Sequence, residues 1–369
     1  MTNSYNILTN AAFKYCELSP EDKDNIIDLY KEDGQQSIYE SAKKKKILPF
    51  VAVLLSRLEI DKAFWVDVAA EYRKRNEDVI GCLDTIFNKL SDNGVRKVFV
   101  TENFGALLAS DADKALFSSG DVDMYADIAQ KEEIYKSFEQ LGYTMIERYS
   151  HKKLISTSFY NDDILSGGFH FGVAWNPLSR MKLPCFVDAD DFVEWDKLWK
   201  YKDTAINLPN IDALMYICLL HISLHSFSRA PDIRLYIDIN NVSKLPVDWE
   251  KIISFAKRDN TMVRVLTACI LAKKLLSVNV PEFVLNYRAQ YERSISRLLK
   301  LIYDEKYNCL LYEPGGIKVL KIEVLADNGN LFFDFIKILF PNRKWVKEFY
   351  VGDKGSLIVA YLKHIKNLF

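Results

Sequence analysis

The sequence SSGDVDM at residues 118–124 decides the fold class and the candidate site. Every second side chain of a β-strand points to the same face, so Asp121 and Asp123 would stand side by side while Val122 and Met124 enter the core. Two adjacent carboxylates repel each other unless a cation joins them. Mg²⁺ takes one or two protein carboxylates and completes its shell with water and phosphate. The same spacing also fits two solvated acids at a strand end, so both interpretations stay open.

The segments around this motif predict a mixed β-sheet with flanking helices, that is, an α+β fold. An amphipathic helix is expected at 130–141, and residues 104–110 fit one or two helical turns. Gly105 would let backbone N–H groups approach phosphates. The expected strands are 95–101, 121–126, 143–149, 154–160 and 169–175.

Helical periodicity dominates the rest of the chain. Ser19 is expected as the N-cap of the first helix, with Pro20 at its first position. The predicted helices are 19–31, 47–58 and 61–90 before the sheet, and 212–226, 233–242, 249–257, 261–276, 287–303, 331–339 and 355–368 after it. We therefore divide the chain into an N-terminal helical segment (1–90), an α/β unit (91–205) and a mainly helical unit (206–369).

The charge balance and the spacing of the cysteines argue against several classes of function. Lys and Arg number 49 against 50 acidic residues, a balance that gives no general field for nucleic acid or anionic lipid. The six cysteines form no C-x-x-C pair, which predicts a reducing, cytoplasmic location. No apolar leader or membrane-length apolar run is expected. We therefore expect no membrane and no nucleic-acid partner.

Two i, i+4 pairs follow the predicted sheet. His221 and His225 have the spacing of a metal pair, but there is no H-E-x-x-H motif and no further zinc ligand is evident. We interpret them as buried, hydrogen-bonded histidines, with His225 near the boundary of the α/β and helical units. Arg234 and Asp238 are predicted to form an ion pair.

Several short motifs follow one another in a characteristic order: Gly105, Asp121-Val122-Asp123, Leu141-Gly142-Tyr143, Phe169-His170-Phe171, the helix at 214–225 and Arg234-Leu235-Tyr236-Ile237-Asp238. In this order and spacing the chain resembles the nucleotidyltransferase superfamily, the fold shared by DNA polymerase β and aminoglycoside adenylyltransferases. It is most similar to the branch of uncharacterised nucleotidyltransferases often found in bacteria.

The resemblance implies that Asp121 and Asp123 hold one or two Mg²⁺ ions and that an NTP is the substrate. It implies transfer of a nucleotidyl group to a hydroxyl or phosphate of a small molecule or protein, with release of pyrophosphate. His170 would accept a proton. The residues expected at the nucleotide are Gly105, Ala106, Ser119, Gly120, His225 and Arg234.

The chain also departs from the pattern of this family. Relatives tend to carry Lys where this chain has Phe104 and Arg where it has Phe117, so two cationic phosphate partners are missing, for which Lys97 or Lys114 could substitute. Ala106 replaces a phosphate-binding hydroxyl. The strand that should bring a third carboxylate has none, with Gly168 at the matching position. A catalytically degenerate member that acts as a ligand-binding or regulatory module is therefore the alternative.

Overall fold

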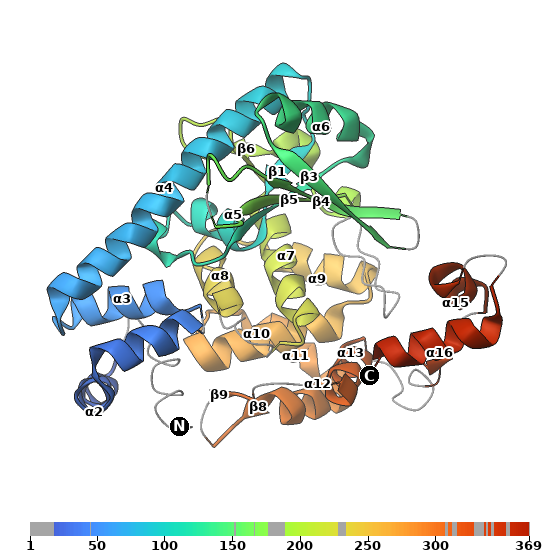
Figure 1. The fold of residues 1–369 in the computed structure, drawn as a ribbon. Helices are drawn as coiled ribbons and strands as arrows, with labels where there is room; N and C mark the ends of the chain where they lie inside the picture. The colour runs from blue at the N-terminus through green and yellow to red at the C-terminus, as the bar shows by residue number, and fades with distance from the viewer. Residues whose placement is uncertain are drawn as a thin grey trace.

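The computed structural model describes residues 18–44, 46–150, 153–165, 167–175, 189–227, 234–306, 309–311, 316–327, 336, 339–340, 343–351 and 355–368. These residues form a mixed five-stranded sheet surrounded by helices (Figure 1). The α+β fold class predicted from the sequence is confirmed.

The sheet has the strand order β1-β2-β5-β4-β3. β2 and β5 run parallel, and the other neighbouring pairs are antiparallel. All five predicted strands are present, with ends that differ by at most a few residues. Their bounds are β1 (Val98–Val100), β2 (Asp121–Ala126), β3 (Thr144–Ser150), β4 (Lys153–Tyr160) and β5 (His170–Ala174).

The two faces of the sheet differ in burial. One face is apolar and buried, because alternate residues of β2, β4 and β5 are Val122, Met124, Phe159, Phe171 and Val173. Phe138 of α6 (Lys131–Gln140) stacks on Phe159 of this face, with ring centroids 3.8 Å apart. The other face carries the half-exposed residues between them, among them both aspartates of the motif. The short helix α5 (Glu102–Ala109) contacts β2, α7 and α8.

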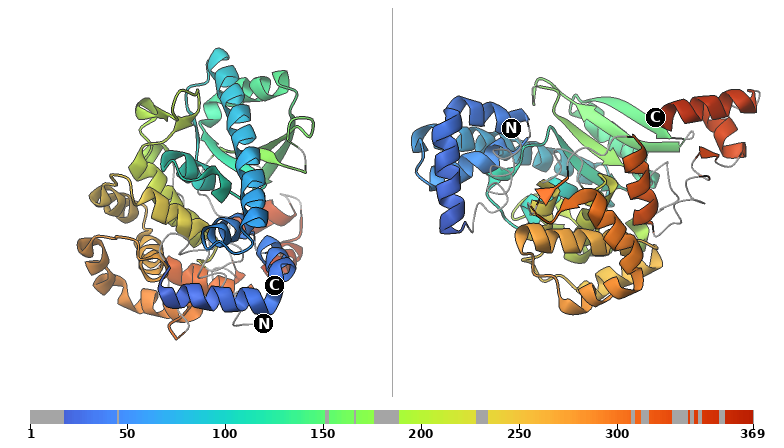
Figure 2. Two further views of the ribbon diagram at one scale, coloured as in Figure 1. Left: turned by 90° about the vertical axis from the view of Figure 1, so that its left-hand side faces the viewer. Right: turned by 90° about the horizontal axis from the view of Figure 1, so that it is seen from below.

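Within residues 18–97, the described helices before the sheet are α2 (Pro20–Lys44), α3 (Leu48–Arg57) and α4 (Lys62–Asp92). The predicted cap is present, because the Ser19 hydroxyl accepts a hydrogen bond from the Asp22 N–H at 3.1 Å. α2 continues beyond the predicted end at residue 31. Gly34 bends it with a φ of 76°, a conformation that glycine adopts without steric cost. α4 runs along one side of the molecule from these helices to the sheet (Figures 1 and 2).

The predicted helices after the sheet are present in the part of the chain that the structure describes, but three further helices, at 282–286, 316–326 and 343–350, were not predicted. α7 is buried almost all round, as its apolar sequence predicted, and Asp248 caps α9 by accepting from the Glu250 N–H. The predicted helix 331–339 lies largely outside the described residues. The helices are α7 (Ile211–Leu224), α8 (Arg234–Val242), α9 (Trp249–Arg258), α10 (Met262–Leu276), α11 (Glu282–Asn286), α12 (Arg288–Ile302), α13 (Gly316–Ala326), α15 (Arg343–Tyr350) and α16 (Leu357–Leu368).

Short elements complete the fold. Four 3₁₀ helices connect the larger elements: η1 (Lys114–Leu116), η2 (Ile128–Gln130), η3 (Ala189–Asp191) and η4 (Trp195–Lys197). Two small antiparallel pairs are β6 (Trp199–Lys200) with β7 (Asn207–Leu208), and β8 (Tyr303–Asp304) with β9 (Cys309–Leu310).

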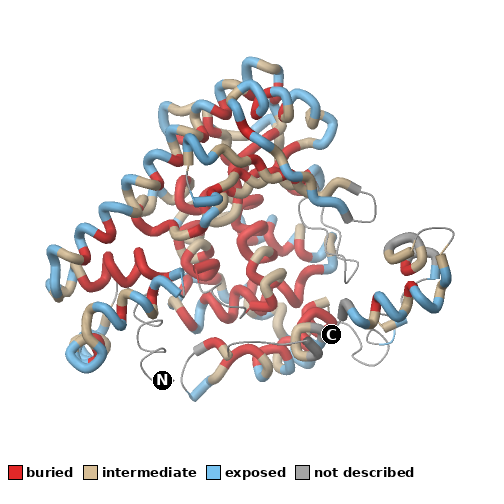
Figure 3. The backbone as a smooth tube through the Cα atoms, in the orientation of Figure 1, coloured by how far each residue is buried: buried red, intermediate tan, exposed pale blue. Residues whose placement is uncertain are grey.

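Buried residues form one continuous apolar cluster that extends from α2 through the sheet to α13 (Figure 3). The helices α7 and α10 lie at the centre of this cluster, below the sheet in Figure 1. The division of the chain at residues 90 and 205 stays a prediction. Among the described helices, none combines the length and the low polarity that crossing a bilayer requires.

Candidate functional site

The strand β2 brings the two motif aspartates to one face of the sheet. Asp121 and Asp123 are half-buried, whereas Val122 and Met124 between and after them are fully buried. Directly before the strand, the Ser119 hydroxyl donates a hydrogen bond to the Asp121 carboxylate. Both carboxylates therefore lie on the side of the sheet that α6 leaves uncovered.

A third carboxylate, which the sequence analysis missed, lies beside this pair. Glu102 begins α5, and its carboxylate lies close enough to that of Asp123 for the two charges to repel each other. Burial and repulsion from the carboxylates of Glu102 and Asp121 raise the pKa of Asp123 well above its usual range. Glu102 has a φ of 54°, a left-handed conformation that costs about 1–3 kcal/mol in a non-glycine residue and is concentrated at functional sites.

A signal for Glu102 was present in the sequence. An acid directly follows the strand at 95–101, and the structure pairs β1 with β2 so that the Thr101 N–H donates to the Asp123 carbonyl at 3.0 Å. The residue after Thr101 is therefore brought next to Asp123. Placing Glu102 beside Asp123 required knowing that β1 and β2 pair in antiparallel orientation, which the sequence alone did not predict.

Hydrogen bonds fix Glu102 from two sides. The Tyr125 hydroxyl donates to Glu102 Oε1 at 2.9 Å, and His221 Nδ1 lies 3.1 Å from Glu102 Oε2. His221 Nε2 lies 3.0 Å from His225 Nε2, so the predicted hydrogen bonding of the two histidines is confirmed, whereas the prediction that they are buried is wrong because both are half-exposed. A row of polar side chains in contact thus extends from Asp123 through Glu102 and His221 to His225 at the end of α7.

Gly105 lies inside α5 rather than in a loop. Its N–H donates to the Thr101 carbonyl at 3.0 Å, and a Cβ at this position would come within 3.0 Å of the Val100 oxygen. Glycine is therefore needed for close packing of α5 against β1. The helical turns predicted at 104–110 are confirmed, but the Gly105 N–H, which was expected to approach a phosphate, is used by the first helical turn. Ala106 is fully buried in the same helix.

An aromatic pair occupies the two positions where cationic residues were expected. The rings of Phe104 and Phe117 meet edge to face with centroids 4.7 Å apart, and both are buried. A cation does reach this place from α4, since the Arg75 guanidinium donates to the Phe117 carbonyl at 2.8 Å. Neither replacement cation expected from the sequence is near it: Lys97 pairs with Asp127, at the end of β2 away from the aspartates, and Lys114 Nζ bonds Asp111.

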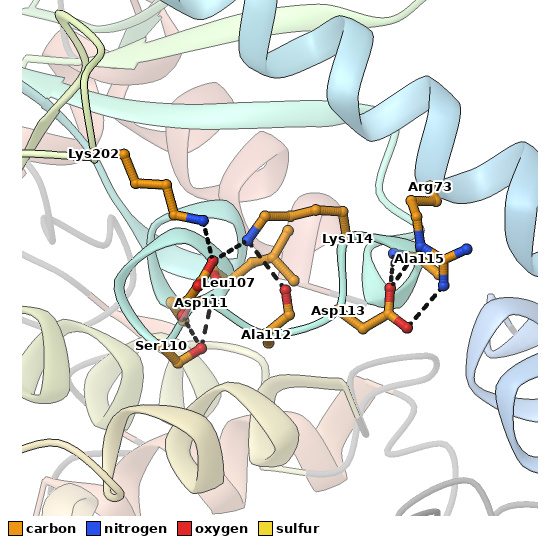
Figure 4. A network of polar contacts seen from close by, with 10 residues as sticks. Arg73, Leu107, Ser110, Asp111, Ala112, Asp113, Lys114, Ala115 and Lys202 are labelled. Atoms are coloured by element: carbon orange, nitrogen blue, oxygen red, sulfur yellow. Dashed lines mark hydrogen bonds and ion pairs between the residues drawn. The ribbon is translucent and has the colours of Figure 1, made fainter.

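The segment between α5 and β2 is held from two sides (Figure 4). Asp111 forms ion pairs with Lys114 at 3.2 Å and with Lys202 at 2.8 Å. Asp113 forms an ion pair with Arg73 of α4 at 2.9 Å and accepts the Ala115 N–H. These contacts fix the chain that leads into Ser119, Gly120 and the strand of the two aspartates.

The predicted ion pair of Arg234 and Asp238 does not form. Arg234 Nη1 instead lies 3.4 Å from the Ser118 hydroxyl, just before the motif. Arg234 Nε and Asp238 Oδ2 are buried and make no hydrogen bond with any residue that the structure describes. Burial raises the pKa of Asp238 well above its usual range, although Arg234 acts in the opposite direction.

Two more buried polar atoms without a hydrogen bond, Thr101 Oγ1 and Asn103 Oδ1, flank Glu102 in the sequence. α5 and α8 pack together, and each carries buried polar atoms, or is directly preceded by one, with no hydrogen-bond partner among the residues that the structure describes. Buried polar groups are nearly always hydrogen-bonded, so the junction has the character of a binding site for a polar ligand.

The strand β5 runs next to β2 on the side opposite β1. His170 is the register partner of Asp121, and Gly172 is the partner of Asp123. A Cβ at Gly172 would lie 3.2 Å from Asp123 Oδ1, so the missing side chain leaves room for that carboxylate. The position next to Asp123 is therefore Gly172 and not Gly168, which precedes β5 with a φ of 75°. The acid that lies beside Asp123 is Glu102 of α5, and not a residue of this strand.

The donor set suits a hard cation with few protein ligands. Across the described part of the chain, no group of three or more His, Cys, Asp or Glu side chains is arranged to hold a metal ion. Asp121 and Asp123 would supply two carboxylates and leave the other positions to water and phosphate, which is the usual environment of Mg²⁺. The residues therefore fit Mg²⁺ bound together with a nucleotide better than a closed structural site.

Comparison with known families agrees with this geometry. A family model described as "Uncharacterised nucleotidyltransferase" matches residues 31–277, which include the sheet, both aspartates and the helices up to α10. The chain therefore belongs to this nucleotidyltransferase family. The comparison with curated proteins found no similar protein, and the comparison with solved structures found no similar structure.

Proposed function

We propose that this protein is a Mg²⁺-dependent nucleotidyltransferase in which Asp121 and Asp123 bind the metal. The observation that supports it most is that Asp121, Asp123 and Glu102 lie close to one another while no lysine or arginine that the structure describes forms an ion pair with any of them. A shared proton between Asp123 and Glu102 is one way to relieve such repulsion, and a divalent ion is another.

The reaction is transfer of a nucleotidyl group from an NTP. An acceptor oxygen attacks the α-phosphorus, the bond from that phosphorus to the β-phosphate oxygen breaks, and pyrophosphate leaves with the electron pair. Mg²⁺ bound at the aspartates would neutralise phosphate charge and polarise the α-phosphate. His170 is proposed to accept the proton of the acceptor hydroxyl, and its place beside Asp121 in the strand register supports this role.

Glu102 is proposed as the residue that orients Asp123. It does so from α5, with Tyr125 and His221 holding its two oxygens. Groups behind a metal ligand of this kind usually change metal affinity 10- to 100-fold when they are altered. The role replaces the third carboxylate that the resemblance placed on a later strand.

The nucleotide is proposed to lie between the loop at 118–120 and the α5–α8 junction. Arg234 reaches Ser118 there, and its Nε is left for a further acceptor. A guanidinium with a spare donor suits a phosphate or a ribose hydroxyl. The proposed roles of Gly105, Ala106 and His225 are indirect: the first two shape α5, and His225 supports His221.

The buried pair of Phe104 and Phe117 supports the second candidate, a nucleotidyltransferase fold that binds a ligand without turnover. The pair removes two cationic contacts and fills their place with apolar rings. Such a protein would keep nucleotide or another ligand bound weakly and act as a binding or regulatory module.

Calorimetry with ATP, GTP, CTP and UTP, each with and without Mg²⁺, tests the proposal. We expect Mg²⁺-dependent binding of at least one nucleotide that Asp121→Asn and Asp123→Asn abolish while the thermal midpoint stays within a few degrees. Asp203→Asn, at an exposed acid, is the matched control. Binding that persists in both site variants would contradict the metal assignment. A pyrophosphate-release assay then distinguishes the two candidate functions, because only the enzyme would release pyrophosphate.

A further inference from the structure

The half-exposed face of the sheet continues beyond the aspartates. Side chains in register across the strands point to the same side, so the row that starts at Asp123 runs through Gly172 and Ser158 to Ile146. A second row starts at Tyr125 and ends at Arg148. Strands are ~4.8 Å apart, so each row extends about 14 Å from β2 to β3.

The middle of both rows is built from small residues. These are Gly172 and Ala174 of β5 and Ser156 and Ser158 of β4, all half-exposed. Neither serine hydroxyl makes a hydrogen bond with another described residue. We call these four residues, together with Ile146 and Arg148 of β3, the outer sheet face. It carries two hydroxyls near the proposed metal site that bond no other residue described by the structure.

Larger rings border one end of the outer sheet face. Tyr160 and His170 stack with ring centroids 4.9 Å apart, and His170 is the register partner of Asp121. At the other end, Arg148 is exposed and forms no ion pair with any residue that the structure describes. The outer sheet face is thus bordered by two aromatic rings at one end and by the guanidinium of Arg148 at the other.

The charge of the face selects the kind of molecule that it would bind. On the side of β3, β4 and β5 that continues from the aspartates, the described strand residues include no acid. Glu147 of β3 belongs to the opposite side, where the Tyr135 hydroxyl of α6 donates to it at 2.7 Å. A polycationic acceptor would meet Arg148 with no acid on these strands to bind it, whereas an anionic group would find a guanidinium with free donors.

We infer that the outer sheet face binds the acceptor, and that the acceptor is a hydroxyl compound with a phosphate or carboxylate group at its far end. Its hydroxyl points to Asp123, its anionic group contacts Arg148, and its polar middle lies over Ser156 and Ser158. This inference rests on the proposed function, because it assigns the second substrate of the same reaction. It makes Arg148 a specificity-determining residue.

Titration calorimetry in the presence of Mg²⁺ and a non-hydrolysable NTP analogue tests the inference. The probes are glucose 6-phosphate, gluconate, glucose and the polycation tobramycin. We expect binding of glucose 6-phosphate, of gluconate or of both. Glucose 6-phosphate tests recognition of a phosphate, and gluconate tests recognition of a carboxylate. A charged hydrogen bond is worth about 1.5–3 kcal/mol, so Arg148→Ala should weaken that binding about 10- to 100-fold.

Two further variants sharpen the test. Ser158→Tyr, which fills the middle of the face, should abolish binding of the anionic probe. Arg293→Ala, at an exposed arginine of α12, is the matched control and should bind as the unaltered protein does. Preference for tobramycin, absence of binding of both anions, or unchanged affinity in Arg148→Ala would each overturn the inference. Binding of the NTP analogue in the same samples reports on the proposed function separately, because none of these substitutions touches the aspartates.

Discussion

Two clusters of buried charge in this protein are built in opposite ways. Between α10 and α13, Arg264 lies 3.0 Å from Glu323 and 2.6 Å from Asp327, so each acid faces a guanidinium. Around β2 and α5, the acids Asp123 and Glu102 face each other, and their nearest donors are a tyrosine and a histidine.

The difference separates charge that stabilises the fold from charge that is placed for a ligand. A buried ion pair is complete without a ligand, and removing one partner leaves an uncompensated charge. A group of carboxylates without a cation is unfavourable in the free protein and becomes favourable only when a cation binds. The predictions below test this contrast.

The largest effect on stability is expected at the cluster of Arg264, Glu323 and Asp327. Arg264→Met removes the guanidinium that faces the buried Glu323 and the half-buried Asp327, which should cost about 3–5 kcal/mol of unfolding free energy in urea titrations. Arg297→Ala, at an exposed arginine of α12, should change it by less than about 0.5 kcal/mol. A loss below about 1 kcal/mol in Arg264→Met would show that the pair is not the stabilising element.

At the cluster of Asp123 and Glu102, removing one charge is expected to affect metal binding and not stability. Glu102→Gln keeps the size of the side chain and removes one negative charge, so the metal-free protein should be no less stable. Mg²⁺ affinity, measured from the thermal shift against Mg²⁺ concentration, should fall about 10- to 100-fold. Unchanged Mg²⁺ affinity, or a large loss of stability without metal, would place Glu102 with the structural charges.

The pH dependence of Asp238 offers a third test. Its folded pKa is raised, so the stability it contributes is complete below the unfolded pKa of about 3.9 and is lost as pH rises through the folded value. Asp238→Asn cannot ionise and should be more stable than the unaltered protein by about 1–3 kcal/mol at pH 7.5. The difference should shrink toward zero near pH 4.5 in urea titrations. A gap that stays constant across this range would argue against a buried ionisable group.

The smallest effect is expected at Gly172. A methyl group there would come 3.2 Å from Asp123 Oδ1, so the carboxylate must move by a few tenths of an ångström. Gly172→Ala should change stability by less than about 1 kcal/mol, because alanine loses less chain entropy in a strand than glycine does. Mg²⁺ affinity should fall a few-fold, whereas Gly81→Ala, at an exposed position of α4 with open space, should leave it unchanged.

Local sequence patterns determined most of the fold. Alternation at 121–126 gave a strand with both aspartates on one side, and the apolar sequence of 212–226 gave a buried central helix, because side-chain periodicity follows directly from backbone geometry. The capping residues Ser19 and Asp248 likewise act within one helical turn.

Only the tertiary structure decided which distant residues meet. The pairing of β1 with β2 brought Glu102 to Asp123, helix packing placed Arg234 on Ser118 instead of on Asp238, and β5 set Gly172 rather than Gly168 beside the site. Such contacts depend on strand order and helix packing between segments far apart in the chain, and no local spacing encodes them. The sequence by itself therefore determined the elements and the two-aspartate motif, while the composition of the site around that motif was settled by long-range packing.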